Sequence, residues 1–380
     1  MNRKGEESRR DYGEASMAKN NLSSRRDLLK HSLQLGAALT PTILRAADKS
    51  GTKTPIVGTG EFTYEVEHDW GVLPNHIRYG NTHGVVEDAQ GRIYICHTVH
   101  KSSQSDHTIL VFDDQGKFIK SWGGEFRGGA HGLHIHKEGN QEFLYLTDTG
   151  KGRPGGGIDP QYTNVVKMTL DGEEVLRIGY PGESDKYELD ANGKPSTKYS
   201  PTNIAIAPNG DIYVGDGYGS YRVSQYDKKG GFIRTFGEHG KEPGQMWRPH
   251  GIRVDLRGPE PELLVADRTN NRLQYFSMEG KYLRSVQGVN RPCHFHEHEG
   301  VLLIPDLAAR VTLLDRKNEV IVHLGEDPAG DYEERRKKGR EDFIPGKFIC
   351  PHGAWFNHRG DIFVTEWVEI GRVSKLRKVA

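Results

Sequence analysis

The sequence predicts an all-β protein, a six-bladed β-propeller with four-stranded blades, whose ring is closed by a strand from the N-terminal part of the chain. A pattern of four short strands separated by turns occurs six times. Glycine makes up 47 of the 380 residues, which is typical of many tight turns. Hydrophobic residues make up only 34% of the chain and the mean hydropathy is -0.70, so many thin sheets are favoured over one thick core.

One copy of the repeat illustrates the pattern. Apolar and polar side chains alternate within each of its segments, as expected for half-buried strands. Its four expected strands are residues 248–254, 263–267, 272–276 and 280–284. The other five copies begin at Thr82, Ala130, Ser200, Arg291 and Cys350.

Each copy has an equivalent anchor residue in its first strand. The six anchors are His83, His131, Thr202, His250, Cys293 and His352. Their separations of 48, 71, 48, 43 and 59 residues are close to the roughly 40–50 residues of a four-stranded blade. The two longest intervals contain polar, glycine-rich or charged stretches that we expect to be surface loops, at residues 150–157, 182–198 and 327–347.

The sixth copy contains only three strands before the chain ends. Residues 62–66 precede the first anchor and have the composition of a strand. We expect this segment to supply the outer strand of the last blade, because pairing the two ends of the chain removes an exposed edge and locks the ring. No linker-like break divides the copies, so we expect residues 51–380 to form one propeller; the alternative is two separate domains.

The first fifty residues resemble an export signal. Residues 24–30, SRRDLLK, resemble the twin-arginine motif, and a moderately apolar run at 33–44 and two alanines follow. The run is too short, and too broken by Gly36 and Pro41, to predict a membrane span. We therefore expect residues 1–50 to direct the protein to the periplasm or to secretion; the alternative is a disordered basic tail.

Charge and cysteine content narrow the class of protein further. The 52 basic and 52 acidic residues give a formal net charge of zero, which gives no support for binding to nucleic acid or to a membrane surface. Three cysteines are too few, and odd in number, for a disulfide framework. We expect a monomer that binds a small-molecule or peptide substrate at one mouth of its central channel.

Four of the six anchors are histidines, which suggests a metal site. The first strand of each blade lines the channel, so the anchors lie at one height around one axis. His131, His250 and His352 come from alternate blades, and their imidazoles can converge on one ion with a fourth position open, as in catalytic zinc sites. Imidazole also suits copper, nickel and iron. The alternative is that each histidine only bonds the backbone of a neighbouring blade.

Three further residues near the anchors are accessory candidates. His83 falls outside the alternate-blade set, so it could face the metal ligands, face the substrate or be purely structural. Cys293 occupies the fifth anchor, and His294 stands beside it.

The third and fourth copies carry sequence patterns of a known enzyme family. The third contains SPTNIAI at 200–206, DIYVGDGY at 211–218 and GFIRTFGE at 231–238. The fourth contains Pro-His-Gly at 249–251 and VADRTNNRLQ at 265–274. These segments resemble peptidyl-α-hydroxyglycine α-amidating lyase, a propeller of NHL repeats, and a more general NHL resemblance extends from about residue 80 to the end.

The resemblance implies a role for each matching residue. The three zinc-binding histidines of the family fall on His131, His250 and His352. A tyrosine that assists catalysis falls on Tyr218, and an arginine that contacts the active site falls on Arg268. The implied reaction cleaves a carbinolamide C–N bond to an amide and glyoxylate. Zn²⁺ would polarise the substrate hydroxyl, Tyr218 would act as general base and Arg268 would pair with the substrate carboxylate.

Other observations leave alternatives open. Where the family has a catalytic arginine just before the first anchor, this chain has Gly-Asn-Thr at 80–82, and Arg78 is the nearest substitute. Gly353 replaces a carboxylate that helps to hold a structural Ca²⁺ in the family, so calcium is in doubt. Tyr218 could simply pack its turn, and Arg268 could form a routine ion pair of its blade. A lactonase, a carbohydrate-acting lyase and a non-catalytic ligand- or protein-binding NHL module are alternative functions.

Overall fold

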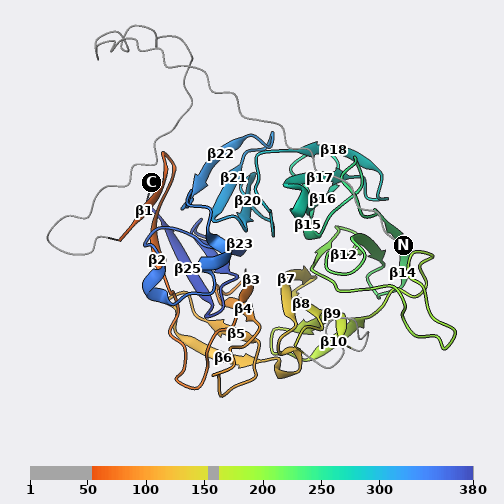
Figure 1. The fold of residues 1–380 in the computed structure, drawn as a ribbon, viewed down its shortest axis with the longest axis horizontal. Coiled ribbons are helices and arrows are strands. Elements are labelled where there is room, and N and C mark those ends of the chain that lie inside the picture. Colours follow the sequence, from red (N-terminus) through yellow and green to blue (C-terminus); the bar gives the residue numbers. More distant parts are fainter. Residues whose placement is uncertain (1–53, 153–161, 380) are drawn as a thin grey trace, which may run out of the picture. The chain divides into compact units, whose positions relative to one another are not determined.

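The computed structural model describes residues 54–152 and 162–379, so the expected export signal lies outside the described residues. Within these ranges the protein is nearly all β, and its strands form six antiparallel sheets. Figure 1 shows the sheets following one another around a central axis in the order of the sequence. The predicted six-bladed propeller is confirmed.

The first three blades each contain four strands in sequence order, and the first strand of each packs near the axis against the first strands of its neighbours. Their strands are β3 (Thr82–Glu87), β4 (Ile93–His97), β5 (Ile109–Phe112) and β6 (Phe118–Trp122); β7 (Ala130–Glu138), β8 (Gln141–Thr149), β9 (Thr163–Thr169) and β10 (Glu174–Ile178); and β11 (Asn203–Ile206), β12 (Ile212–Asp216), β13 (Arg222–Tyr226) and β14 (Phe232–Phe236).

The next three blades continue the same order, and the last blade combines strands from both ends of the described chain. Their strands are β15 (Pro249–Asp255), β16 (Glu262–Asp267), β17 (Arg272–Phe276) and β18 (Tyr282–Val286); β19 (His296–His298), β20 (Val301–Asp306), β21 (Arg310–Leu314) and β22 (Val320–Leu324); and β23 (Pro351–Phe356), β24 (Ile362–Glu366), β25 (Arg372–Lys378), β2 (Phe62–His68) and β1 (Ile56–Thr59).

The ring closes as predicted. Strand β2 pairs antiparallel with β25, with Tyr64 opposite Lys378, and so becomes the fourth strand of the last blade. Strand β1 pairs with β2 and adds a fifth strand that the sequence analysis did not predict. Because β2 hydrogen-bonds to β25, the two ends of the described chain are tied into one sheet and the ring is locked, with β1 as the outer edge of the last blade.

The hydrophobic core lies between neighbouring sheets. Between the second and third blades, Tyr145 and Val165 pack against Ile212 and Val214, all of them buried. Each such aliphatic side chain contributes roughly 1.5–3 kcal/mol on burial. The low overall hydrophobicity is sufficient because each blade buries a thin apolar layer on both of its faces.

Two expected segments differ in detail. The first strand of the fifth copy was expected at residues 291–295, but β19 begins at His296, and only an isolated bridge from Pro292 to Asp306 precedes it. Arg291 has a positive φ of 58°, but Arg248 has one of 62° directly before Pro249, which begins β15, so these local features do not account for the later start of β19. The expected loop at 327–347 contains two short helices, α1 (Tyr332–Arg335) and η4 (Arg340–Asp342), and Tyr332 packs against the buried fifth anchor region.

The cysteines do not form a disulfide framework among the described residues. Cys96, Cys293 and Cys350 are all buried and free. The expected loop at 182–198 forms turns outside the sheets, whereas most of the 150–157 loop lies outside the described residues. Among the described residues, no helix has both the length and the apolar character needed to cross a bilayer.

His68 in the closing strand provides a test of the ring closure. Its Nε2 accepts a hydrogen bond from Gly346 N at 3.0 Å, and its Nδ1 lies 2.8 Å from Ser374 Oγ. Burial, reinforced by Arg372, lowers the pKa of His68 to about 3. Below about pH 6.5, the ordinary pKa of histidine, His68 takes up a proton in the unfolded chain but stays neutral in the folded protein. The free energy of unfolding therefore decreases as the pH falls from about 6.5 towards 3.

We expect His68→Gln to remove this pH dependence, because glutamine can still accept from Gly346 and donate to Ser374. Urea unfolding of both proteins between pH 7.5 and pH 5 measures the effect. The free energy of unfolding of the wild type should fall relative to the variant by up to about 1.4 kcal/mol per pH unit below pH 6.5. Parallel curves for the two proteins would contradict the assignment.

Candidate functional site

The histidine anchors of four blades meet at one position on the axis. The ring centroids of His131, His250 and His352 lie 4.8, 4.7 and 4.7 Å apart, so the alternate-blade set does converge. His83 lies beside two of them, with its ring centroid 4.6 Å from that of His131 and 4.5 Å from that of His352. All four side chains are buried. We call these four residues the histidine cluster.

Backbone carbonyls of the next blade orient three of these rings. The Nδ1 atoms of His131 and His250 lie 2.7 Å from Thr202 O and 2.8 Å from Cys293 O. His352 Nδ1 lies 3.1 Å from His83 O, which links the last blade to the first. A carbonyl oxygen only accepts, so each Nδ1 carries the proton and each Nε2 presents a lone pair.

The histidine cluster contains more imidazole lone pairs than hydrogen-bond donors that can reach them. Tyr218 Oη lies 3.1 Å from His131 Nε2 and 3.0 Å from His250 Nε2, but a phenol has a single proton and can donate to only one of them. The third lone pair, on His352 Nε2, lies 3.3 Å from His83 Nδ1. At least one buried lone pair therefore lacks a hydrogen-bond donor, which suits a cation.

Burial also keeps these imidazoles neutral. It lowers the pKa of His131 and His250 well below the usual range, and electrostatic interactions with His352 for the first and with Arg268 for the second add to the effect. Burial, together with Arg268, lowers the pKa of His352 to about 3. Neutral imidazole is the form that binds metal ions.

Arg268 reaches the cluster rather than an ion pair of its blade. It is the first residue of η3 (Arg268–Asn270), and its Nη1 lies 3.4 Å from Tyr218 Oη. The blade's own ion pair uses Arg272, whose Nε lies 2.8 Å from Asp267 Oδ2. Arg268 is buried, its Nε has no partner among the described residues, and no carboxylate there pairs with it. The routine ion-pair interpretation is therefore wrong for Arg268.

A buried carboxylate holds the turn that carries Tyr218. Asp216 ends β12 and accepts hydrogen bonds from Ser200 N at 2.8 Å, Gly219 N at 2.9 Å, Ser220 N at 2.7 Å and Tyr187 Oη at 2.8 Å. This network ties the turn after β12 to the loop before β11. The phenol of Tyr218 thereby reaches two imidazoles, so the turn-packing interpretation does not account for its position.

Glycine at position 217 is required by the neighbouring blade. A Cβ there would lie 2.1 Å from Pro249 O, closer than any side chain could approach. The Asp-Gly-Tyr sequence therefore combines a carboxylate anchor, a close backbone approach and the phenol.

Lys151 is a member of the site that the sequence analysis missed. Its Nζ lies 4.1 Å from the centroid of the Tyr218 ring. It follows β8 in a loop whose length differs from the other copies, so the repeat pattern carries no signal for it. Lys151 and Arg268 together give the site two cationic groups around one phenol.

The two other accessory candidates, Cys293 and His294, are both buried. Cys293 is buried, its Sγ lies 3.9 Å from Arg268 Nη1, and its ligand atom is within 4.8 Å of those of His250 and His352. His294 is also buried, its Nδ1 lacks a partner among the described residues, and burial lowers its pKa to about 4.

Arg78 is not brought into the histidine cluster. Its side chain is exposed, and Nη1 donates to Asn75 O at 3.0 Å and Ile77 O at 2.7 Å, both in its own loop. Arg78 is close to the first anchor in the sequence, but this closeness did not predict where its side chain points.

The structure gives no place for a carboxylate after the last histidine. A Cβ on Gly353 would lie 2.4 Å from His83 O and 2.7 Å from Thr365 Oγ1. The innermost strands of the last and first blades are packed too closely for a side chain at this position. These residues therefore do not fit the calcium site that the family resemblance implied.

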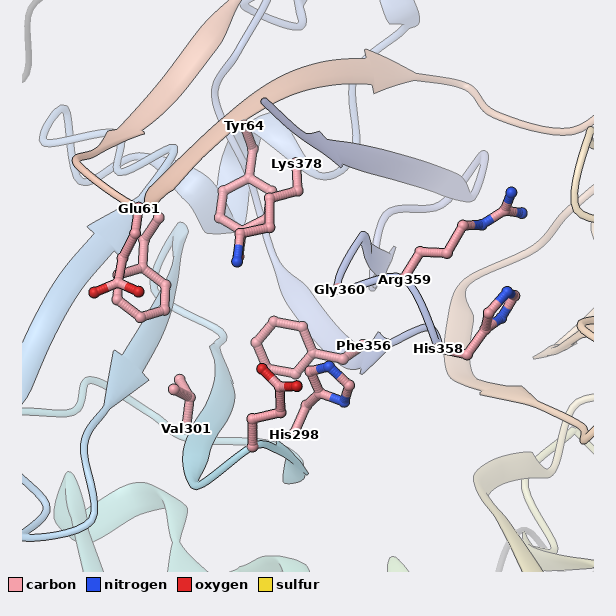
Figure 2. A pocket seen from close by; sticks show the side chains of 11 residues that line it. Glu61, Tyr64, His298, Val301, Phe356, His358, Arg359, Gly360 and Lys378 are labelled. Carbon is pink, nitrogen blue, oxygen red and sulfur yellow. The ribbon is translucent and has the colours of Figure 1, made fainter. Parts of the chain in front are cut away.

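A separate pocket of about 280 Å³ is lined by residues of the fifth and sixth blades, from the inner strands β19 and β23 and the outer strands β2 and β25. Figure 2 shows Glu61, His298, His358 and Lys378 around it. Phe356, at the opposite end of β23 from His352, also lines it. No residue of the histidine cluster borders this pocket, so it is distinct from the candidate site.

Asp216→Ala should destabilise the protein by at least about 3 kcal/mol, because it leaves buried donors without an acceptor. Urea unfolding monitored by circular dichroism measures this. Tyr187→Phe is the matched variant, since it removes one of the four donors and should cost about 1 kcal/mol. Equal losses in the two variants would show that Asp216 does not organise the turn.

Known proteins share both the sequence pattern and the fold. No family model matches the chain. It is 27% identical to peptidyl-α-hydroxyglycine α-amidating lyase 1 of Drosophila melanogaster over 250 residues, which are 56% of this chain and 40% of the relative. It is 30% identical to a probable amidating lyase of Caenorhabditis elegans over 177 residues, 46% of this chain and 44% of the relative. The matches thus span less than half of either relative.

A solved gluconolactonase of Xanthomonas campestris superposes with a TM-score of 0.54 at 12% identity, covering 88% of this chain and 99% of that structure. At this identity the likeness concerns the fold alone. Together, the fold, the convergent anchors and the curated relatives identify the chain as a six-bladed, NHL-like propeller that resembles the peptidyl-α-hydroxyglycine α-amidating lyases.

Proposed function

We propose that this protein is a zinc-dependent lyase of the amidating-lyase type, which cleaves a carbinolamide C–N bond to an amide and glyoxylate. The observation that carries the proposal is the gathering of three imidazole rings, with centroids 4.8, 4.7 and 4.7 Å apart, beside Tyr218 and Arg268. The similarity to amidating lyases over about half of the chain supports this reaction class.

The donor set fits zinc. His131, His250 and His352 offer lone pairs from three blades, each fixed by a carbonyl behind it, an arrangement typical of metal-binding histidines. When bound there, zinc would polarise the substrate hydroxyl and lower its pKa.

Arg268 and Lys151 would bind the substrate carboxylate. Arg268 is buried without an acidic partner among the described residues, which is costly unless an anion completes the site. A guanidinium can pair with a carboxylate through two parallel hydrogen bonds. Lys151, which is exposed at the mouth, adds a second positive charge near the Tyr218 ring. A substrate with a carboxylate beside its reacting carbon is therefore favoured.

Tyr218 would move the proton. Acting as a phenolate between the positive charges of Arg268 and Lys151, its Oη would take the proton of the substrate hydroxyl as general base. As that oxygen becomes the aldehyde of glyoxylate, the C–N bond breaks and its electron pair passes to the amide nitrogen. Tyr218 would then return the proton to this nitrogen, so that no other reactant is needed.

Purified protein supplied with zinc should release glyoxylate from α-hydroxyhippurate, a small carbinolamide with a carboxylate. Tyr218→Phe should lower kcat by roughly 10²–10⁴-fold, the usual contribution of a general base. His250→Ala should lower bound zinc from about one ion per chain towards zero, as measured by elemental analysis.

His107→Ala serves as the control histidine, because this exposed side chain contacts Ser121 far from the cluster. Full turnover by Tyr218→Phe, or unchanged zinc in His250→Ala, would refute the corresponding assignment. Zinc binding without glyoxylate release would favour another propeller enzyme, such as a lactonase or carbohydrate-acting lyase. Absence of bound zinc would favour a ligand- or protein-binding module.

We further propose that residues 1–50 direct the protein through twin-arginine export to the periplasm or outside the cell. The support is the SRRDLLK sequence followed by an apolar run. In a bacterial host, Arg25→Lys together with Arg26→Lys should move the protein from the exported to the cytoplasmic fraction. Export of the double variant at the wild-type level would contradict this route.

A further inference from the structure

His83 differs from the other members of the histidine cluster in what its ring nitrogens contact. The other three rings turn Nδ1 away towards a carbonyl of the next blade. His83 Nδ1 instead faces the cluster, 3.3 Å from His352 Nε2. Among the described residues, no backbone carbonyl holds its ring. A nitrogen of His83 is therefore directed towards the Nε2 atom of His352.

The four rings of the histidine cluster form two triangular groups of three imidazoles, here called faces, and the two faces share one edge. His131, His250 and His352 form one face, and His83 completes a second face with His131 and His352. Ligand nitrogens of His83, His131 and His352 all lie within 4.8 Å of one another, and all three residues are buried. His250 lies next to the shared edge, with its ring centroid 4.8 Å from that of His131 and 4.7 Å from that of His352.

The backbone of His83 is well fixed for such a role. Its carbonyl accepts from His352 Nδ1 at 3.1 Å and from Thr365 Oγ1 at 3.0 Å. These two bonds from the last blade set the position of the first anchor relative to His352. The ring reaches the cluster as a consequence of ring closure.

We propose that His83 is a fourth imidazole ligand of the metal ion at this site, so that the resting centre is held by four histidines from the first, second, fourth and sixth blades. The inference rests on the proposed metal centre and adds a ligand to it. Two nitrogens on one tetrahedral zinc ion lie about 3.4 Å apart, given Zn–N distances of roughly 2.0–2.1 Å. His83 Nδ1 and His352 Nε2 already lie 3.3 Å apart.

Cys293 is the competing fourth ligand, since its Sγ lies within 4.8 Å of ligand atoms of His250 and His352. Its thiol, however, donates to Arg291 O at 3.6 Å and contacts Arg268 at 3.9 Å. These partners occupy the sulfur, whereas in the described part of the chain His83 Nδ1 has only His352 as its hydrogen-bonding neighbour. Zinc can take a fifth ligand during reaction, so four histidines still admit a substrate oxygen.

X-ray absorption at the zinc edge of the zinc-loaded protein tests the proposal, because outer-shell scattering counts imidazoles. The wild type should show four nitrogen ligands from four imidazoles and no sulfur. His83→Ala should show three and bind zinc at least roughly tenfold more weakly in competition with a chelator. His107→Ala, which changes the exposed control histidine, should keep four. Three imidazoles in the wild type, or a sulfur ligand, would overturn the proposal.

Glyoxylate release by the same wild-type sample separates this inference from the proposed function. Three imidazoles together with glyoxylate release would refute the role of His83 and leave the lyase standing. Four imidazoles without release would support His83 and refute the lyase. If His83→Ala fails to fold, as judged by circular dichroism, the wild-type imidazole count decides alone.

Discussion

The candidate site depends on one repeated hydrogen bond, from the Nδ1 of an anchor histidine to a backbone carbonyl of the next blade. This bond fixes the tautomer, so the lone pair of Nε2 faces the axis. It also makes the site a property of the whole ring, because His352 in the last blade is held by His83 in the first. The pairing of β2 with β25 closes the ring on which that contact depends. Fold and site are therefore coupled through the same segment.

Buried carboxylates perform the second structural task, which is to hold the loops in front of the anchors. Asp216 accepts from Ser200 N, Asp267 accepts from Trp247 N at 2.7 Å, and Glu366 accepts from Ile349 N at 2.7 Å. Each of these acidic residues ends the second strand of its blade. Its carboxylate accepts hydrogen bonds from donors of the same blade or of the loop in front of it. The acidic groups thus support the channel mouth from outside, while Arg268 and Lys151 leave the site itself cationic. That separation of charge makes the site more favourable for an anion than for a positively charged organic group.

Much of this arrangement could be predicted from the sequence because it is periodic. The six copies define the blades, and equivalent positions in a ring must lie at one height, which brings His131, His250 and His352 together. The strand at residues 62–66 could be assigned to the last blade because the sixth copy lacked its fourth strand. Tyr218 and Arg268 were found through local motifs, and each motif has a physical basis: Gly217 allows the close approach to Pro249, and η3 carries Arg268 beside the cluster.

The residues that the sequence misplaced or missed lie where periodicity gives no information. Arg78 turns into its own loop, and Lys151 arrives from a loop of irregular length. His83 was an accessory candidate whose role the sequence left open, and the structure brings its ring beside His131 and His352. By itself the sequence determined the number of blades, their order and the residue types at the mouth, since these follow from strand patterns and spacing. Only the tertiary structure decided which nitrogen of each ring faces the axis and which charged side chains reach it, because these depend on contacts between blades that are distant in the chain.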